Sequence, residues 1–496
     1  MSFPESRIRR LSLQLGPNPR RVLLRPFLPS LIVKPLTAPE PNQRVANLFS
    51  RIMLLEEADV ERKLGEVMGE FTDRHQRIRE IFLSRFDQIR SLLPTDRELS
   101  ESRRILLGSY FMNEYSLESS ALFNPSIVSS PDQSGLKEGE LRFILSLRAT
   151  GEGHVSSITF RSGVVTATGD ISMDPVSRYV HQPRPQPAAE YNLALFRRKL
   201  QELGLDPPLV LTFTQDLPEC FLMEDLVRIV KRVRAGRDRM EIRRTAERAL
   251  LLAQSNYTVR FADGLDISEK IIFPYAQNES NGIEDARFVR FTEDDGSFMY
   301  YATYTAYDGN IVLPQMVETR DFQEFRMSTL NGAAVLNKGL ALFPRRIHGR
   351  YVMLGRQDGE NIHLMDSDHP HFWSQSRIIL RPSEPWEFVQ LGNCGSPIET
   401  PEGWLVLTHG VGAMRKYCLG AALLDRDDPS RVLGRLREPL LHPAPDEREG
   451  YVPNVVYSCG ALVHAGNLIL PYAVSDTASR FAVVPLADLL QTLRAG

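Results

Sequence analysis

Between residues 42 and 93, apolar side chains recur every three or four positions, beginning with Val45, Phe49 and Ile52. This spacing places them on one face of an amphipathic helix. We therefore predict a helical N-terminal extension over residues 1–105.

A second helical pattern runs from about residue 189 to 253, after the proline-rich segment HQPRPQPAAE. It contains the basic run LVRIVKRVRAGRDRMEIRRTAERALL. The charges of this run lie between periodic apolar positions and acidic residues, which indicates a solvated helix face rather than a nucleic-acid contact. We expect a helical insertion over about residues 188–255.

Five further runs resemble one another: a turn glycine, then apolar and aromatic residues, then a polar residue. They are GELRFILSLRATGEG from Gly139, GSFMYYATYTAYDG from Gly296, GRYVMLGRQDG from Gly349, GWLVLTHGVG from Gly403 and GNLILPYAVSD from Gly466. The last four start 53, 54 and 63 residues apart. Such a period suits four-stranded propeller blades, whereas a β-sandwich usually lacks it. The prediction is a mainly β fold, a five-bladed β-propeller over residues 106–496.

In a propeller, equivalent ends of the blades converge on the axis. The polar residues at these ends could therefore line one central pocket although they are far apart in sequence. They are Arg148, Asp308, Arg356, His409 and Asp476.

The amino-acid composition argues against several classes of binding partner and site. The 496 residues are 42% apolar and carry a net charge of −3, which gives no overall attraction to nucleic acid or anionic membrane. Four scattered cysteines favour neither a zinc site nor a disulfide framework, and no stretch approaches the roughly 18 apolar residues of a membrane span. We expect a cytoplasmic protein without a metal, and interpret the two histidines of HPHFW as part of a loop.

The segment NGIEDARFVRF places Glu284, Asp285 and Arg287 before a predicted strand. Carboxylates beside aromatic residues suit carbohydrate chemistry, because an acid must protonate a glycosidic oxygen. Clustered cations such as Lys338 and His409 add a site for an anion. Each residue also has a structural interpretation: a turn carboxylate with its ion-pair partner for Asp285 and Arg287, a solvated amine for Lys338, and a buried core imidazole for His409.

Several ordered motifs closely resemble glycoside hydrolase family 130, the mannoside phosphorylases and β-1,2-mannosidases. They are GIEDAR, YTAYDG, NKGLALFP, GNCGSPIETPEGWLVLTHGVG, LGAALLDRDDPSRVLGRLREPLL and GYVPNVVYSCGAL, with weaker matches at NPSIV and LRATGEG. The resemblance spans about residues 255–490 and implies a five-bladed propeller. Two departures are Ala286, where many members have proline, and a longer spacing between His409 and Tyr417.

The resemblance implies that Asp285 is the general acid of an inverting reaction and acts through a hydroxyl of the bound mannose. In the phosphorolytic members, inorganic phosphate attacks the anomeric carbon and releases α-mannose 1-phosphate. The matching phosphate-binding positions are Lys338, Arg356 and His409, together with Arg287 and Tyr417. Asp476 is expected to contact the sugar, and Arg148, Tyr304 and Asp308 are the other candidates for sugar contacts.

Three functions remain open. The favoured one is a mannoside phosphorylase, with phosphate as co-substrate and no cofactor, because a phosphate dianion needs no general base. The second is an inverting β-mannosidase, with Glu284, Asp308 or Glu360 as the base. The third is a non-catalytic glycan-binding propeller. The helical segments could also make an interface in a homo-oligomer.

Overall fold

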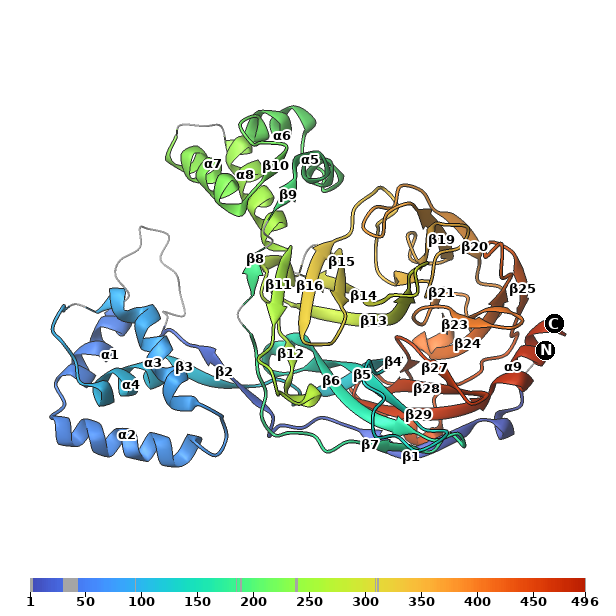
Figure 1. Cartoon of the computed structure of the whole chain (residues 1–496), viewed down its shortest axis with the longest axis horizontal. Coiled ribbons are helices and arrows are strands. Elements are labelled where there is room, and N and C mark those ends of the chain that lie inside the picture. The colour runs from blue at the N-terminus through green and yellow to red at the C-terminus, as the bar shows by residue number, and fades with distance from the viewer. Residues whose placement is uncertain are drawn as a thin grey trace. The chain divides into compact units, whose positions relative to one another are not determined.

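A computed structural model of the chain describes residues 3–29, 43–93, 95–183, 185–187, 190–236, 240–307, 309 and 312–495 (Figure 1). The chain divides into two compact units. Unit 1 comprises Met1–Pro17, Ser120–Val176 and Gln182–Gly496, and unit 2 comprises Asn18–Ser119 and Ser177–His181. Among the described residues, no helix is both long and apolar enough to span a membrane.

Unit 2 is mainly helical. It contains β2 (Val22–Pro26), α1 (Gln43–Met53), α2 (Glu57–Phe71), α3 (Ile78–Ile89), α4 (Glu101–Tyr110) and β3 (Met112–Ser116). The periodic residues Val45, Phe49 and Ile52 are buried in its core, as their spacing predicts. A fully buried ion pair joins Arg21 Nε to Glu118 Oε1 at 3.0 Å.

Unit 1 is mainly β, as predicted. Its eleven-stranded sheet contains β4 (Ala121–Ser129), β5 (Leu141–Thr150), β6 (Ser156–Val165), β7 (Ile171–Met173), β8 (Gln186–Pro187), β11 (Tyr257–Arg260), β12 (Ile271–Ile272), β13 (Gly282–Thr292), β14 (Phe298–Tyr307), β15 (Val312–Thr319) and β16 (Glu324–Thr329). A four-stranded sheet contains β17 (Ala341–Leu342), β18 (Tyr351–Gly355), β19 (Ile362–Ser367) and β20 (Arg377–Leu380).

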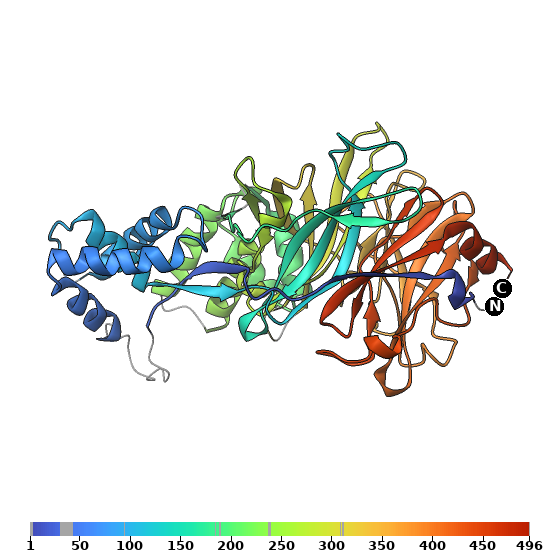
Figure 2. The same ribbon diagram turned by 90° about the horizontal axis from the view of Figure 1, so that it is seen from below.

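Two five-stranded sheets complete the β structure of unit 1. One contains β21 (Gln390–Asn393), β22 (Ile398–Thr400), β23 (Gly403–Val411), β24 (Tyr417–Leu424) and β25 (Val432–Arg435). The other contains β1 (Arg9–Leu15), β26 (Val456–Tyr457), β27 (Leu462–His464), β28 (Asn467–Val474) and β29 (Ala478–Pro485), and helix α9 (Leu486–Arg494) follows it. Strand β1 runs along β29 in both views (Figures 1 and 2).

The five similar runs of the sequence are the strands β5, β14, β18, β23 and β28. Each pairs antiparallel with the strand that follows it, namely β6, β15, β19, β24 and β29. A single parallel pairing, Gly282 with Ser156, joins the first two of these hairpins in one sheet. Strand pairing among the described residues shows no closed sheet, so the five-bladed propeller stays a prediction.

The insertion forms a helical subdomain within unit 1. It contains β9 (Tyr191–Asn192), α5 (Leu193–Glu202), α6 (Pro207–Thr214), β10 (Cys220–Phe221), α7 (Met223–Ala235) and α8 (Met240–Gln254). On α7, which carries the start of the basic run, Leu226 and Val230 are buried in the subdomain core. Arg228 and Arg232 of the same helix are largely exposed, as expected for a solvated face.

Candidate active site

Residues from four of the five strand ends lie around one cavity of about 270 Å³. Arg148 comes from β5, Arg356 follows β18, His409 comes from β23, and Asp476 follows β28. Asp308, the fifth residue of this set, lies outside the described residues. The repeat in the sequence therefore leads to a shared cavity for all four described members.

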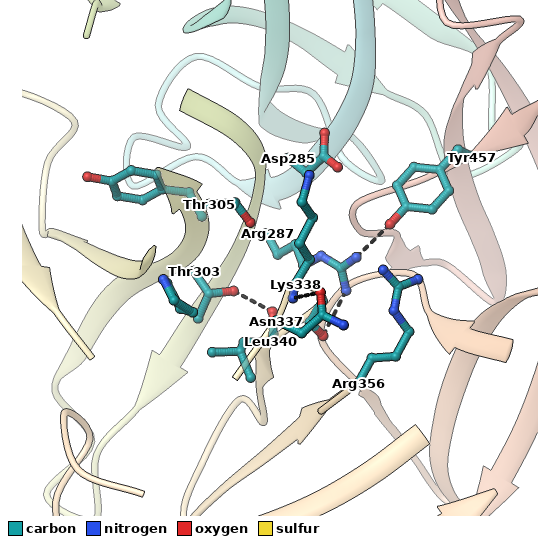
Figure 3. A pocket seen from close by; sticks show the side chains of 12 residues that line it. Asp285, Arg287, Thr303, Thr305, Asn337, Lys338, Leu340, Arg356 and Tyr457 are labelled. Carbon is teal, nitrogen blue, oxygen red and sulfur yellow. Dashed lines mark hydrogen bonds between the residues drawn. The ribbon is translucent and has the colours of Figure 1, made fainter. Parts of the chain in front are cut away.

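A smaller hollow of about 30 Å³ adjoins this cavity (Figure 3). The two share Asp285, Lys338, Arg356 and Tyr457. The smaller hollow can hold little more than a water molecule. Together they form one site, which we call the central pocket.

Asp285 owes its position to a β-bulge. Strand β13 pairs Glu284 with Thr305 but Arg287 with Thr303, so it carries one extra residue relative to β14. Asp285 lies in this bulge with a left-handed φ of +54°. A bulge re-aims a side chain, and a left-handed non-glycine residue costs about 1–2 kcal/mol.

Strand β4 carries a matching bulge at Asn124. Phe123 pairs with Arg148 and Ser126 with Ser146, again with one extra residue, and Asn124 has a φ of +49°. The two bulged residues meet, since Asn124 Nδ2 donates a 2.7 Å hydrogen bond to Asp285 Oδ1. Two strained positions of neighbouring sheet segments thus fix one carboxylate in the pocket.

Glu284 ties two cations together beside Asp285. Arg148 Nη2 donates to Glu284 Oε1 at 2.9 Å, and Lys338 Nζ donates to Glu284 Oε2 at 2.6 Å. Arg148 Nη1 also lies 3.3 Å from Asp285 Oδ1. Glu284 is thereby engaged on both oxygens.

The two aspartates of the pocket differ in acidity. Burial alone would raise the pKa of Asp285, but Arg148, the Asn124 hydrogen bond, Lys338 and Arg287 outweigh it and lower that pKa. Burial and the Asp285 carboxylate raise the pKa of Asp476 to about 6, against the opposing effect of Arg148 and Arg415. In the free protein Asp285 is therefore ionised, whereas Asp476 holds its proton to higher pH.

Arg356 and His409 form a second hydrogen-bonded pair in the lining of the pocket. Arg356 Nη1 donates to His409 Nε2 at 3.1 Å, and the Gln390 amide nitrogen lies 3.0 Å from the same imidazole nitrogen. Burial, followed by Arg356 and Arg287, lowers the pKa of His409 well below its usual value. His409 is therefore a neutral acceptor that orients Arg356. Arg356 Nε is buried and has no hydrogen-bond partner among the described residues.

Arg287 lines the smaller hollow but bonds mainly to protein (Figure 3). Its Nη1 donates to the carbonyls of Gly339 and Asn393 at 3.1 and 3.0 Å, and its Nη2 donates to Tyr457 Oη at 2.6 Å. Burial opposes its charge, but Tyr457 and other neighbours raise its pKa. This guanidinium joins three segments of unit 1 beneath the pocket.

The other predicted residues occupy different places. Tyr417 lines the pocket, and its ring is nearly parallel to the imidazole of His409, with centroids 6.0 Å apart. Tyr304 borders the smaller hollow, but its hydroxyl donates to the fully buried Glu279 at 2.8 Å. Glu360, one of the suggested bases, is exposed and does not line the pocket.

In the larger cavity, sequence reasoning missed three neutral polar residues: Asn124, Gln390 and Tyr457. Asn124 and Tyr457 lie within the motifs NPSIV and GYVPNVVYSCGAL, so the motifs signalled the segments but not the side chains. Among the described residues, no group of three or more His, Cys, Asp or Glu side chains could hold a metal ion.

A family model described as beta-1,4-mannooligosaccharide phosphorylase matches residues 221–495. A 1,2-beta-oligomannan phosphorylase of Thermoanaerobacter sp. (strain X514) is 34% identical over 241 residues, which cover 46% of this chain and 77% of that relative. A beta-1,2-mannobiose phosphorylase of Listeria innocua serovar 6a is 32% identical over 235 residues, 45% of this chain and 63% of that relative.

Among solved structures, the beta-1,2-mannobiose phosphorylase from Listeria innocua in complex with beta-1,2-mannobiose aligns with a TM-score of 0.46 and 24% identity. The alignment covers 77% of this chain and 94% of that one. The family model, which spans more than half of the 496 residues, decides the family. The chain belongs to glycoside hydrolase family 130.

Proposed function

We propose that this chain is an inverting mannoside phosphorylase. It uses inorganic phosphate to cleave the terminal β-mannosidic bond of manno-oligosaccharides and releases α-mannose 1-phosphate. The observation that carries the proposal is the central pocket, in which the carboxylate of Asp285 and the cations Arg148, Lys338 and Arg356 line one cavity. The curated relatives that it resembles are mannoside phosphorylases by name.

The reaction balances with a single acid. The bond between the anomeric carbon and the bridging oxygen breaks, and a bond from that carbon to a phosphate oxygen forms on the opposite face of the sugar. The leaving oxygen gains one proton, and monohydrogen phosphate loses one. Asp285 relays the proton through a hydroxyl of the bound mannose, as in the family. No general base is required, because phosphate is already an anion.

Arg356 and Lys338 are the phosphate ligands. Arg356 has a free buried Nε, and its Nη1 is held by the neutral His409. Lys338, held by Glu284, lines the same cavity. A guanidinium and an ammonium that face one cavity suit a phosphate dianion, since charge-assisted hydrogen bonds are the strong ones. Arg287 and Tyr417 support this site from its walls.

Phosphate binding also favours the protonated form of Asp285, the general acid. In the free protein, Arg148 and Lys338 are among the groups that lower the pKa of Asp285. A phosphate dianion beside Lys338 offsets that cation and shifts the pKa of Asp285 upward, toward the protonated form that a general acid needs.

Hydrolysis is the second candidate function, and the observation that favours it is the carboxylate of Asp476 in the pocket. Glu284 is engaged by two cations and Glu360 lies outside the pocket, so neither can activate water. Asp476, with a pKa raised to about 6, is the remaining described carboxylate that could act as a base. The chain would then be an inverting β-mannosidase. A binding module without catalysis would not need an acid beside an anion site.

For the architecture we propose the five-bladed ring, with residues 106–496 as the catalytic propeller and residues 1–105 as an extension whose first strand, β1, is shared with the ring. Two contacts support closure. Leu122 N on β4 donates to Thr477 O beside β28 at 2.9 Å, so the first hairpin unit meets the last. In addition, β1 pairs with β29, which lets an N-terminal strand complete the last blade. We further propose that no cofactor takes part, and that the reaction is cytoplasmic, where a sugar phosphate is useful.

The test is incubation of the purified protein with β-1,2- and β-1,4-linked manno-oligosaccharides, with and without inorganic phosphate. Mannose and mannose 1-phosphate are both assayed. Mannose 1-phosphate that forms only with phosphate supports phosphorolysis, and the substrate that reacts gives the linkage. Free mannose at an equal rate without phosphate would establish hydrolysis and refute the proposal.

A further inference from the structure

Exposed large apolar side chains lie next to pocket-lining residues in four different loops. Each is more than half exposed, from 54% for Leu336 to 94% for Met414. Each lies within two residues of a side chain that lines the pocket, namely Asn337, Gln390, Arg415 or Val452. We call this set the apolar rim: Leu336, Phe388, Val389, Met414 and Tyr451. Single exposed apolar residues are ordinary, but a set around a polar pocket marks a binding surface.

The backbone presents these side chains outward. Phe388 and Val389 occupy the centre of a turn closed by a 2.9 Å hydrogen bond from Gln390 N to Glu387 O. Tyr451 is anchored by its backbone N, which donates to Thr477 Oγ1 at 2.8 Å. Its hydroxyl lies 3.3 Å from His154 Nδ1. Backbone hydrogen bonds therefore fix both segments in conformations that leave the apolar side chains exposed to solvent.

Met414 combines the highest exposure in the rim with a left-handed backbone conformation. It lies in the hairpin from Gly412 to Lys416 with a left-handed φ of +56°. The hairpin from Gly151 to Val155 has the same closing hydrogen bond, and a glycine, Gly153, at the corresponding position. Glycine adopts this conformation without strain, whereas methionine does not. The chain thus carries a strained, almost fully exposed methionine next to Arg415 of the pocket.

The size of the pocket indicates what passes over the rim. At about 270 Å³ it is slightly smaller than a typical small-molecule site of about 300–1,000 Å³. It can hold one sugar ring with phosphate but not a chain. If the terminal mannose enters, the rest of the oligosaccharide must leave through the mouth. The C–H faces of pyranose rings are apolar and pack on apolar and aromatic side chains.

We infer that the apolar rim binds the sugar units beyond the first on the leaving side of the bond, so that the enzyme prefers oligosaccharides longer than two units. This inference rests on the proposed function for its substrate class. Burial of about 55 Å² of apolar surface at the rim would raise kcat/KM about tenfold between a disaccharide and a tetrasaccharide.

The test compares kcat/KM for β-linked manno-di-, tri- and tetrasaccharides in the presence of phosphate. The wild type should prefer the longer chains, and the variants Phe388→Ala, Met414→Gly and Tyr451→Ala should lose that preference while retaining turnover of the disaccharide. Leu54→Ala, which removes an exposed side chain of unit 2, is the matched control and should change nothing. Met414→Gly relieves strain, so its loss of preference cannot be ascribed to misfolding.

A binding measurement separates this inference from the proposed function. Calorimetric titration of the Asp285→Asn variant with the same oligosaccharides needs no turnover. Affinity that rises with chain length, and stops rising in Met414→Gly, supports the rim whether the reaction is phosphorolysis or hydrolysis. Phosphorolysis with no effect of chain length would overturn the rim and leave the function standing. A rim variant that converts a dimer to a monomer would assign the rim to a second copy of the chain and also overturn the inference.

Discussion

Replacement of Asp476 by asparagine should stabilise unit 1, and more so at alkaline pH. Burial, followed by the neighbouring Asp285 carboxylate, raises the pKa of Asp476 from 3.8 to about 6. The folded protein therefore binds this proton more tightly than the unfolded chain does. As pH rises from about 4 to 6, the unfolded chain loses the proton first, and the free energy of unfolding falls. Above about pH 7 the whole penalty is present.

The size of the effect follows from these two values. The difference between 6 and 3.8 corresponds to about 3 kcal/mol at pH 8. At pH 5, Asp476 of the folded state is still largely protonated, and the loss in the free energy of unfolding is only about 1.6 kcal/mol. Asparagine removes the charge, keeps the shape and tolerates the left-handed φ of +49° at this position. Asp476→Asn should therefore gain up to about 3 kcal/mol at pH 8 and about half of that at pH 5.

Urea unfolding followed by tryptophan fluorescence measures this gain. The three tryptophans, Trp373, Trp386 and Trp404, all lie in unit 1, so the signal reports on the unit that contains Asp476. The control is Asp263→Asn, at an exposed position of the same unit, which should show no such gain. Equal or lower stability of Asp476→Asn at pH 8, or a gain that does not depend on pH, would refute the assigned cause.

Three further predictions concern the pocket. Asp285→Asn should keep the far-UV circular dichroism of the wild type but lower kcat by at least about 10²-fold, since general acid catalysis contributes that much or more; turnover near the wild-type rate would remove Asp285 as the acid. Arg356→Met should raise the KM for phosphate about tenfold or more and the KM for the sugar much less, because it deletes a charge-assisted hydrogen bond; steady-state kinetics with each substrate varied would contradict this if both rose equally. Arg287→Met should destabilise unit 1 by about 3 kcal/mol, since it leaves one buried and two partly buried acceptors without a donor; an unchanged urea midpoint would show that water replaces the guanidinium.

The strands of unit 1 could be predicted because their signal is local. A turn glycine followed by apolar residues identifies β5, β14, β18, β23 and β28 without any long-range information. The convergence of Arg148, Arg356, His409 and Asp476 followed from the repetition of that signal. These predictions depend on periodicity, which a single sequence contains.

The remainder of the site depends on contacts between distant residues. Asn124 and Asp285 are 161 positions apart, and nothing local indicates that both lie in bulges and share a hydrogen bond. The protonation state of His409 is likewise set by burial and by two arginines from other strands. Tyr304 has an aromatic neighbourhood in the sequence, yet its hydroxyl bonds to the buried Glu279. The neutral polar residues of the site and the hydrogen-bond partners of its side chains could therefore not be predicted from the sequence.

The pairing of β1 with β29 has a consequence for biosynthesis. Arg9 lies opposite Val483, 474 positions later in the chain. At a ribosomal rate of roughly 5–20 residues per second, β1 waits roughly 25–95 s for its partner. During that time unit 2 can already fold, while β1 presents unpaired backbone groups that a chaperone or another nascent chain could capture. The yield of this protein should therefore depend on how its early strand is shielded until translation reaches the end of the last sheet.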